Sequence, residues 1–452
     1  MNDLDTIAAI ATPPGDGGIG IIRVSGPKAF NITDQIFKSF DGVSCNTREH
    51  GRFNFGKIIN SNRDTVDHAI VLIMRNPHSF TGDDTSEIQL HGGIIILKEV
   101  LSMILNLGAR LAENGEFSKR AFINGKIDLT QAEAICDLIS AKSKRAAQIA
   151  VNQLEGDLSN EINYIYNLFL EITANLETTI DFIEDELPDD VFTGIQKKFF
   201  ECEDKLINLI KTWDEGKILR EGLTISIIGK PNAGKSTLFN KLLGFDRAIV
   251  SEIKGTTRDT LEEGYILNGY PIKLVDTAGL RDTECLIEVE GIKRTEKMLE
   301  KSDFVIYIID ASVDMDSSEI VRINNFPSDK YLVLSNKIDK GKMVNIKNSV
   351  DISLLDDKSN QVIKDELRKI IEKNLNLNFS NTLVSERHKN LLEQTIIEVN
   401  QVKKLFSQNI ESQAVIICNH LGIILNILGQ ITGKVYHDEL LENIFSRFCI
   451  GK

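Results

Sequence analysis

Nine residues, GKPNAGKST from Gly229 to Thr237, match the pattern G-x-x-x-x-G-K-[ST], which wraps a chain of phosphates. The glycines let backbone N–H groups turn inward onto the phosphates. Lys235 can reach the β- and γ-phosphates, and the Ser236 hydroxyl can hold Mg²⁺. The pattern needs a strand before it and a helix after it, and TISII and TLFNKLLG supply both. The stretch therefore predicts a nucleotide site.

Three further segments follow in the order that such a site requires. Thr257 in GTTRD can complete the Mg²⁺ shell. In DTAG, Asp276 would lie near the metal and the Gly279 N–H near the γ-phosphate. In NKID, the Asp339 carboxylate can accept from guanine N1–H and N2–H₂, which adenine does not offer. The four segments together indicate a guanine-nucleotide hydrolase. The predicted nucleotide contacts are Asn232, Ala233, Gly234, Lys235, Ser236, Thr237, Ser251, Glu252, Ile253, Lys254, Gly255, Thr256, Thr257, Asp276, Thr277, Ala278, Gly279, Asn336, Lys337, Ile338 and Asp339.

The residue that orients the attacking water is not in its usual position. Ras-type GTPases carry Gln directly after DTAG, whereas this chain has Leu280, which cannot polarise water. The acidic stretch ECLIEVEG supplies three candidates: Glu284, Glu288 and Glu290. No arginine finger is evident, so positive charge would come from a partner, from Arg258 or from a monovalent cation bound by Asn232. As a residue type, Asn232 is equally explained as a turn former.

A fifth guanine-site segment is expected after NKID, usually as a loop of the Ser-Ala-Lys kind. The nearest segment is DISLLDD, residues 351–357, and it is a poor match.

Three kinds of sequence surround these motifs. Residues 1 to about 118 mix short β-rich runs with Gly and Pro turns, which predicts an α+β domain. Strand-length apolar runs then alternate with helix-compatible sequence in the motif region, as in a parallel α/β sheet. Helical sequence lies on both sides of that region, and neither block looks self-sufficient. We therefore predict an α+β domain (1–118), a discontinuous all-α domain (119–216 and 378–452) and an inserted α/β Ras-like G domain (217–377). The first helical block carries apolar residues at steps of three and four, Leu158, Ile162, Ile165, Phe169, Ile172, Leu176 and Ile180.

Composition limits the remaining possibilities. The chain has 452 residues and a net charge of −14, which disfavours nucleic-acid binding through a globally basic surface. Any RNA contact would use local clusters, which are equally explained as solvated helix faces. These clusters are Lys119, Arg120 and Lys126, and Lys142, Lys144 and Arg145. Six scattered cysteines suit a reducing cytosol. The most apolar stretch, residues 415–429, is too short to span a bilayer and is expected to form a buried helix.

Four stretches taken together resemble one family. They are DTIAAIATPPGDGGIGIIRVSG, GEFSKRAFINGKIDLTQAEAICDLI, the GTPase motifs and FCIGK. The combination closely resembles the MnmE (TrmE) family of tRNA-modification GTPases over the whole chain. One departure is Asp16, which stands where the family commonly has Arg.

The resemblance implies an N-terminal domain that dimerises and binds a tetrahydrofolate, such as 5-formyltetrahydrofolate. It also implies action with the flavoprotein MnmG, as a heterotetramer with the MnmE homodimer. Together they would install an aminomethyl or carboxymethylaminomethyl group at C5 of the wobble uridine of certain tRNAs, at the expense of GTP. The expected location is the cytoplasm, with no membrane partner.

The family's functional residues are carried over position by position. The folate contacts fall on Arg23, Glu87, Lys126 and Lys452. A K⁺ ion would take the place of an arginine finger, at Asn232, Ser251, Ile253 and Thr256. The family's water-orienting glutamate selects Glu288. An RNA-binding switch GTPase of the Era kind is the alternative, but it should carry a KH module with a GXXG loop, and ITGKV is not one.

Cys449 in RFCIGK has three readings. Prenylation is disfavoured because Gly451 is not aliphatic, Lys452 is not a usual last residue and no polybasic stretch precedes the motif. A packing cysteine is the ordinary reading. The resemblance implies instead a thiol required for modification, close to the folate site, with its chemical role open.

Overall fold

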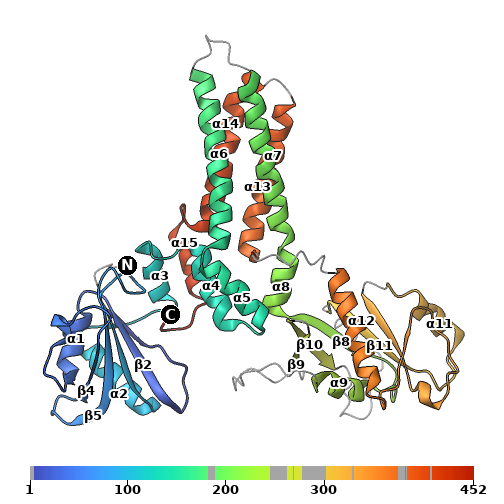
Figure 1. Cartoon of the computed structure of the whole chain (residues 1–452), viewed down its shortest axis with the longest axis horizontal. Coiled ribbons are helices and arrows are strands. Elements are labelled where there is room, and N and C mark those ends of the chain that lie inside the picture. The colour runs from blue at the N-terminus through green and yellow to red at the C-terminus, as the bar shows by residue number, and fades with distance from the viewer. Residues whose placement is uncertain are drawn as a thin grey trace. The chain divides into compact units, whose positions relative to one another are not determined.

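The computed structural model describes residues 5–181, 189–244, 262–267, 269–276, 302–327, 330–374, 382, 384–407 and 410–452. The chain divides into two units, Met1–Cys136 with Leu428–Lys452, and Asp137–Ile427. The three predicted kinds of fold are present, and Figure 1 shows their elements. The domain boundaries derived from sequence stay a prediction.

The first unit is built on a seven-stranded sheet in the order β3-β4-β5-β6-β2-β1-β7. Neighbouring strands are antiparallel except β1 and β7, which are parallel. The strands are β1 Ile7–Ile10, β2 Gly17–Ser25, β3 Phe37–Ser39, β4 Phe53–Ile59, β5 Thr65–Met74, β6 Thr85–Gly92 and β7 Arg110–Leu111.

Alternation along the strands gives this sheet two different faces. One face is covered by α1 (Ala29–Ile36) and α2 (Ile94–Asn106), and its core includes Ile22 and Ile88. The opposite face presents Phe53 and Phe55, which are 72% and 54% exposed. Arg23 and Glu87 alternate with Ile22 and Ile88, so they lie on this opposite face, where the Phe117 ring lies against Arg23.

The end of the chain belongs to the same unit as its beginning. Helices α3 (Glu116–Ile123), α4 (Leu129–Ser140) and α15 (Asp438–Phe445) share a buried cluster that includes Phe122, Leu129, Phe445 and Phe448. Residues from both ends of the sequence therefore build one core.

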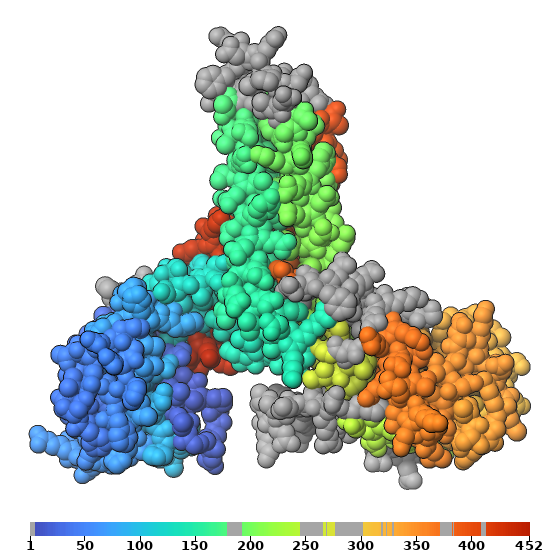
Figure 2. All heavy atoms as spheres, in the orientation of Figure 1, coloured from blue at the N-terminus to red at the C-terminus, as the bar shows by residue number. Residues whose placement is uncertain are grey.

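The second unit contains long helices and the G domain. The helices are α5 Lys144–Leu154, α6 Asp157–Asp181, α7 Asp189–Lys211, α8 Trp213–Glu221, α13 Glu386–Phe406 and α14 Ile410–Thr432, whose last residues enter the first unit. In α6 the predicted apolar stripe is buried from Leu158 to Leu176. Helices α6 and α7 lie in contact along their length in the space-filling view (Figure 2). Lys403 of α13 pairs with Glu203 of α7 at 2.7 Å, so the two helical blocks pack together as predicted.

The apolar helix α14 is longer than predicted. Its segment Gln413–Thr432 is long and apolar enough to cross a membrane by length and composition alone, so the expectation of too short a segment is wrong. The helix runs from Ile410 to Thr432 and so extends beyond the apolar stretch 415–429 at both ends. One face, including Ile417, Leu421 and Ile424, is fully buried, as in a core helix.

The G domain has a six-stranded sheet in the order β13-β12-β11-β8-β10-β9, parallel except for the β9–β10 hairpin. Its strands are β8 Leu223–Ile228, β9 Glu262–Leu267, β10 Tyr270–Asp276, β11 Phe304–Asp310, β12 Tyr331–Asn336 and β13 Val350–Asp351. Its helices are α9 Lys235–Leu243, α11 Ser317–Asn324 and α12 Lys358–Asn374. Parallel strands end at one edge of the sheet, and the sequence motifs follow β8, β10 and β12 at that edge.

Candidate functional site

The phosphate-binding motif lies between β8 and α9, as its pattern predicts. A cavity of about 530 Å³ opens at this position. It is lined by Pro231, Asn232, Gly234, Lys235, Ser236, Thr237, Asn336, Lys337, Asp339, Lys340, Ser353, Leu354 and Leu355. Gly234 has φ +114°, and a Cβ there would lie 2.5 Å from Nδ2 of Asn336, so only glycine fits. The cavity thus joins the phosphate motif to the guanine motif.

Two polar side chains hold this loop. The Lys235 ammonium donates to the carbonyls of Gly229 (3.0 Å) and Lys230 (2.9 Å), at the place that phosphate oxygens would take. Asn336 donates from Nδ2 to the Ala233 carbonyl at 2.8 Å. Its Oδ1 accepts from the Leu354 N–H at 3.0 Å. Asn336 therefore ties the phosphate loop to the segment after β13.

The guanine side has its own supports. Asp339 lies in the short 3₁₀ helix Ile338–Lys340, and its Oδ1 accepts from the Ser353 hydroxyl at 2.6 Å. Lys337 has φ +65° and donates to Asp310 at 2.6 Å. Burial would raise the pKa of Asp310, but hydrogen bonds from Lys337 and Ser312 outweigh it and lower that pKa. The DISLLDD segment, a poor match by pattern, lines the cavity and orients the Asp339 carboxylate, which is expected to accept from guanine.

The donor set suits Mg²⁺, which takes oxygen ligands. The Ser236 hydroxyl lines the cavity, and Asp276 ends β10 in parallel register with Ile227 of β8, just before the phosphate loop. The remaining predicted residues lie outside the described part of the chain. They are Ser251, Glu252, Ile253, Lys254, Gly255, Thr256, Thr257, Thr277, Ala278, Gly279 and Glu288.

A second group of predicted residues meets on the face of the first unit's sheet that lies opposite α1 and α2. Arg23 on β2 and Glu87 on β6 form an ion pair at 2.7 Å, with side chains 17% and 16% exposed. Arg23 also donates from Nη1 to the carbonyl of Gly451 at 3.2 Å and lies over the Phe117 ring at 5.5 Å. One arginine thus joins the sheet to the C-terminal tail, residues 449–452.

Several backbone contacts hold the C-terminal tail in place. Gly451 has φ +93°, and a Cβ there would lie 2.5 Å from the Ile10 carbonyl oxygen. Ile450 forms a β-bridge with Asn114, and the Gly115 N–H donates to the Cys449 carbonyl at 3.5 Å. The Cys449 side chain is exposed. The tail therefore lies beside Arg23 and leaves its thiol accessible.

Lys126 is placed differently from the other predicted folate contacts. Its ammonium donates to the Pro77 carbonyl at 2.9 Å. Among the described residues, no hydrogen bond or ion pair joins Lys126 to Arg23, Glu87 or the C-terminal tail. The geometry thus brings together Arg23, Glu87 and the tail that ends in Lys452, and leaves Lys126 at the neighbouring 77–84 loop.

Two members of the predicted basic clusters are not available to RNA. Arg120 is 12% exposed and pairs with Asp5 and Glu116. Arg145 pairs with the buried Glu215 and stacks over the Tyr270 ring at 5.0 Å. The arginine of each cluster is therefore neutralised by carboxylates of this chain, and any RNA contact there would depend on the lysines.

Comparison with known proteins gives the family. The pattern described as "MnmE helical domain" matches residues 129–449, and "GTP-binding protein TrmE N-terminus" matches residues 6–126. The tRNA modification GTPase MnmE of Alkaliphilus metalliredigens (strain QYMF) is 40% identical over 459 residues, covering 99% of each chain. Those of Alkaliphilus oremlandii (strain OhILAs) and Clostridioides difficile (strain 630) are each 39% identical, also covering 99% of each chain. The chain belongs to the MnmE family of tRNA modification GTPases.

Membership of the MnmE family makes the chain a GTPase, in agreement with the phosphate and guanine motifs. Two features of its sites escaped sequence reasoning. Ser353 is 14 residues from Asp339, and only the pairing of β12 with β13 brings them together. The pairing of Arg23 with Glu87, 64 residues apart, likewise depends on the register of β2 and β6.

Proposed function

We propose that this chain hydrolyses GTP while installing an aminomethyl or carboxymethylaminomethyl group at C5 of the wobble uridine in certain tRNAs. The one-carbon unit comes from a tetrahydrofolate such as 5-formyltetrahydrofolate, and the flavoprotein MnmG is the partner of an MnmE-type homodimer. The relatives that match 99% of the chain are tRNA modification GTPases by name, which supports tRNA as the substrate.

The observation that carries the proposal is the docking of the C-terminal tail on the sheet. Arg23 contacts both Glu87 and the Gly451 carbonyl, so residues far apart in sequence form one polar site next to an exposed thiol. A GTPase that served only as a switch would not need such a site. This site and the cavity that would receive the nucleotide are built from different residues. In the proposal, the cavity serves GTP hydrolysis and this site serves the transfer of the one-carbon unit.

The residues of this site suit a folate. A carboxylate such as Glu87 accepts from the amino and ring N–H groups of a pterin, and a guanidinium pairs with the carboxylates of the glutamate tail. Since Arg23 and Glu87 pair with each other, folate must compete with that ion pair or bind beside it. The exposed Phe53, Phe55 and Ile70 on the same face support a dimer contact there.

In the nucleotide cavity, the residues of this chain bind and orient GTP. Lys235 exchanges two carbonyl partners for phosphate oxygens, and Asp339, held by Ser353, accepts from the guanine edge. Ser236, with Asp276 and Thr257, would hold Mg²⁺, which neutralises phosphate charge. Asn232 would contribute to a K⁺ site that supplies the charge of an arginine finger.

Glu288 is proposed to orient the attacking water. Replacing it by Ala or Gln removes a carboxylate from the reaction without removing a ligand of the nucleotide. We therefore expect near-normal GTP binding and a hydrolysis rate lower by about 10²–10⁴-fold, the usual contribution of such a group. Single-turnover hydrolysis measures the rate, and turnover equal to that of the unchanged protein contradicts the role.

Nucleoside mass spectrometry of tRNA tests the proposed function. A strain lacking this protein should lose the modified wobble uridine, and the unchanged gene should restore it. Complementation by Cys449→Ser should leave the nucleoside missing while GTP hydrolysis by the purified variant persists. Unchanged nucleosides in the deletion strain would rule the proposal out.

A further inference from the structure

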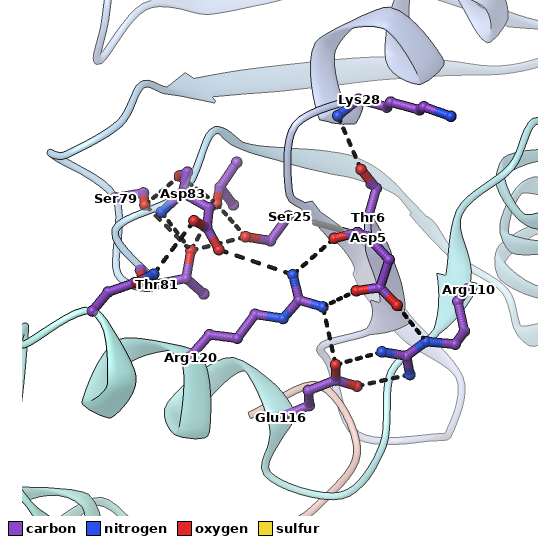
Figure 3. Close-up of polar contacts among 12 residues, drawn as sticks. Asp5, Thr6, Ser25, Lys28, Ser79, Thr81, Asp83, Arg110, Glu116 and Arg120 are labelled. Carbon is purple, nitrogen blue, oxygen red and sulfur yellow. Dashed lines mark hydrogen bonds and ion pairs between the residues drawn. The ribbon is translucent and has the colours of Figure 1, made fainter. Parts of the chain in front are cut away.

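Glu116, the first residue of α3, is the buried centre of a partly exposed ion network (Figure 3). Its carboxylate is 2% exposed and accepts from both guanidinium nitrogens of Arg110, at 3.0 and 2.6 Å. It also accepts from Arg120 at 3.1 Å and from the backbone N–H of Glu113 at 2.8 Å. Both carboxylate oxygens are therefore used.

Asp5 completes the network from the other side. Its carboxylate accepts from Nε of Arg110 at 2.8 Å and from Nη2 of Arg120, and its carbonyl accepts from Nη1 of Arg120 at 2.9 Å. Asp83 adds a longer ion pair to Arg120 at 3.9 Å, so two arginines face Glu116, Asp5 and the more distant Asp83. The network joins the residues before β1 to β7 and α3, so it fixes the turn 113–116 that lies between the last two.

The opposite side of this turn receives the C-terminal tail. Asn114 donates to the Ser446 carbonyl at 3.4 Å and bridges Ile450, and the Gly115 N–H donates to the Cys449 carbonyl. Gly115 has φ +65°, and a Cβ there would lie 2.6 Å from the Phe445 carbonyl oxygen. Glu116 itself does not contact the tail in the described contacts. Its effect on the tail passes through the neighbouring residues Asn114 and Gly115, which contact the tail directly.

We propose that Glu116 is a positioning residue for the C-terminal tail, holding the turn 113–116 in the shape that seats residues 449–452 beside Arg23. Its importance for modification rests on the proposed function, whereas its effect on the tail does not. The negative charge is essential, because a neutral side chain leaves Arg110 and Arg120 with Asp5 and only the more distant Asp83.

The test compares Glu116→Gln with Glu113→Gln in the full chain. Glu113 lies in the same turn with its side chain exposed, so it is a matched control. Peptide-resolved mass spectrometry measures the rate at which iodoacetamide alkylates Cys449. Cys45 and Cys202 serve as internal references, since burial raises the pKa of each thiol to about 12. We expect alkylation of Cys449 to rise at least threefold in Glu116→Gln and to stay unchanged in Glu113→Gln.

A double-variant comparison separates positioning from general stability. Binding of 5-formyltetrahydrofolate is measured by calorimetry in the full chain and in a chain lacking residues 449–452, each with and without Glu116→Gln. The affinity should fall several-fold only when the tail is present. An equal fall in both backgrounds, or an unchanged rate of Cys449 alkylation, overturns the proposal.

Two further measurements keep the test decisive. If Glu116→Gln does not fold, Arg110→Lys retains the charge but loses the two-nitrogen contact, and it should raise Cys449 alkylation by a smaller factor. No change in that variant also overturns the proposal. If the unchanged protein does not bind 5-formyltetrahydrofolate, the folate part of the proposed function fails, while the alkylation rates still decide the role of Glu116.

Discussion

At the scale of single residues, the nucleotide cavity depends on side chains that orient other groups of the site. The Asp339 carboxylate is the group expected to accept from guanine, and the Ser353 hydroxyl holds it by a 2.6 Å hydrogen bond. Asn336 has the same kind of role for the phosphate loop, through the Ala233 carbonyl. Asn336 is buried, and a buried side chain that loses its partner costs more than the bond itself contributes, so this position affects binding beyond any contact of its own with the ligand.

Replacing Ser353 by Ala should therefore weaken nucleotide binding. The loss of one hydrogen bond to a charged group costs about 1.5 kcal/mol, or roughly tenfold in the Kd for GDP. Calorimetric titration of GDP measures it. Ser349→Ala is the control, since Ser349 bonds Ser335 and the Ile346 carbonyl away from the cavity. Equal affinities of the two variants would contradict the role of Ser353.

The ion network around Glu116 predicts a dependence of stability on pH. Burial would raise the pKa of Glu116, but hydrogen bonds from Arg110, from the Glu113 N–H and from Arg120 outweigh it, so the pKa lies below the ordinary 4.5. A lowered pKa contributes stability that is present above about pH 4.5 and is lost as pH falls through the folded-state value. Glu116→Gln has no such group to titrate.

The melting temperatures of the unchanged protein and of Glu116→Gln should consequently differ most above about pH 4.5 and converge as the pH falls through the folded-state pKa of Glu116. Thermal unfolding followed by circular dichroism at a series of pH values measures both curves. A difference that stays constant over this range would show that the Glu116 charge does not contribute.

At the scale of elements, one junction connects the helices of the second unit to the G domain. Glu215 of α8 is 3% exposed and pairs with Arg145 of α5. It also accepts from the Tyr270 hydroxyl at 3.1 Å, where β10 begins. Ile149 of α5 and Leu219 of α8 belong to the same apolar cluster as the core of the G domain. The β9–β10 hairpin is thus anchored by charge and by packing.

Arg145→Ala should weaken this junction strongly, since it leaves the Glu215 carboxylate buried without its cation. The expected loss of unfolding free energy is about 3 kcal/mol. Urea unfolding measures it. Lys144→Ala, an exposed neighbour on the same helix, should change stability by less than about 0.5 kcal/mol. Similar losses in both variants would contradict the importance of the buried pair.

At the scale of the whole molecule, the two sites belong to different units. The nucleotide cavity is built by residues of Asp137–Ile427, and the C-terminal tail docks in the unit formed by Met1–Cys136 and Leu428–Lys452. Damage confined to the tail should therefore spare GTP hydrolysis.

Gly451→Ala tests this separation. The added methyl would lie 2.5 Å from the Ile10 carbonyl oxygen, and Ala is strained at a φ of +93°. The tail must therefore move away from Ile10. We expect loss of the modified wobble nucleoside and a kcat for GTP hydrolysis within about twofold of the original, because binding sites in separate units act additively. Gly108→Ala is the control, with φ +103° but no atom within 4 Å of the added methyl. If Gly451→Ala lost GTP hydrolysis while Gly108→Ala kept it, the two sites would not be independent of each other.

Sequence predicted the parts of this molecule that are encoded locally. The phosphate motif fell between a strand and a helix, NKID followed β12, and the stripe of α6 was buried, because each depends on residues close together in the chain. The ion pairs of Arg23, Arg120 and Arg145 were not predictable, since their partners depend on strand register and helix packing.

The shared core of the first unit also has a consequence for folding kinetics. Phe445 and Phe448 pack with Phe122 and Leu129, although roughly 290 residues of the second unit lie between them. In a loop of that length, closure is entropically costly while the intervening chain is unfolded, and far less so once it has folded and shortened the span. The second unit should therefore fold first, and a nascent chain that has not passed residue 428 should expose the apolar faces of α3 and α4 to chaperones.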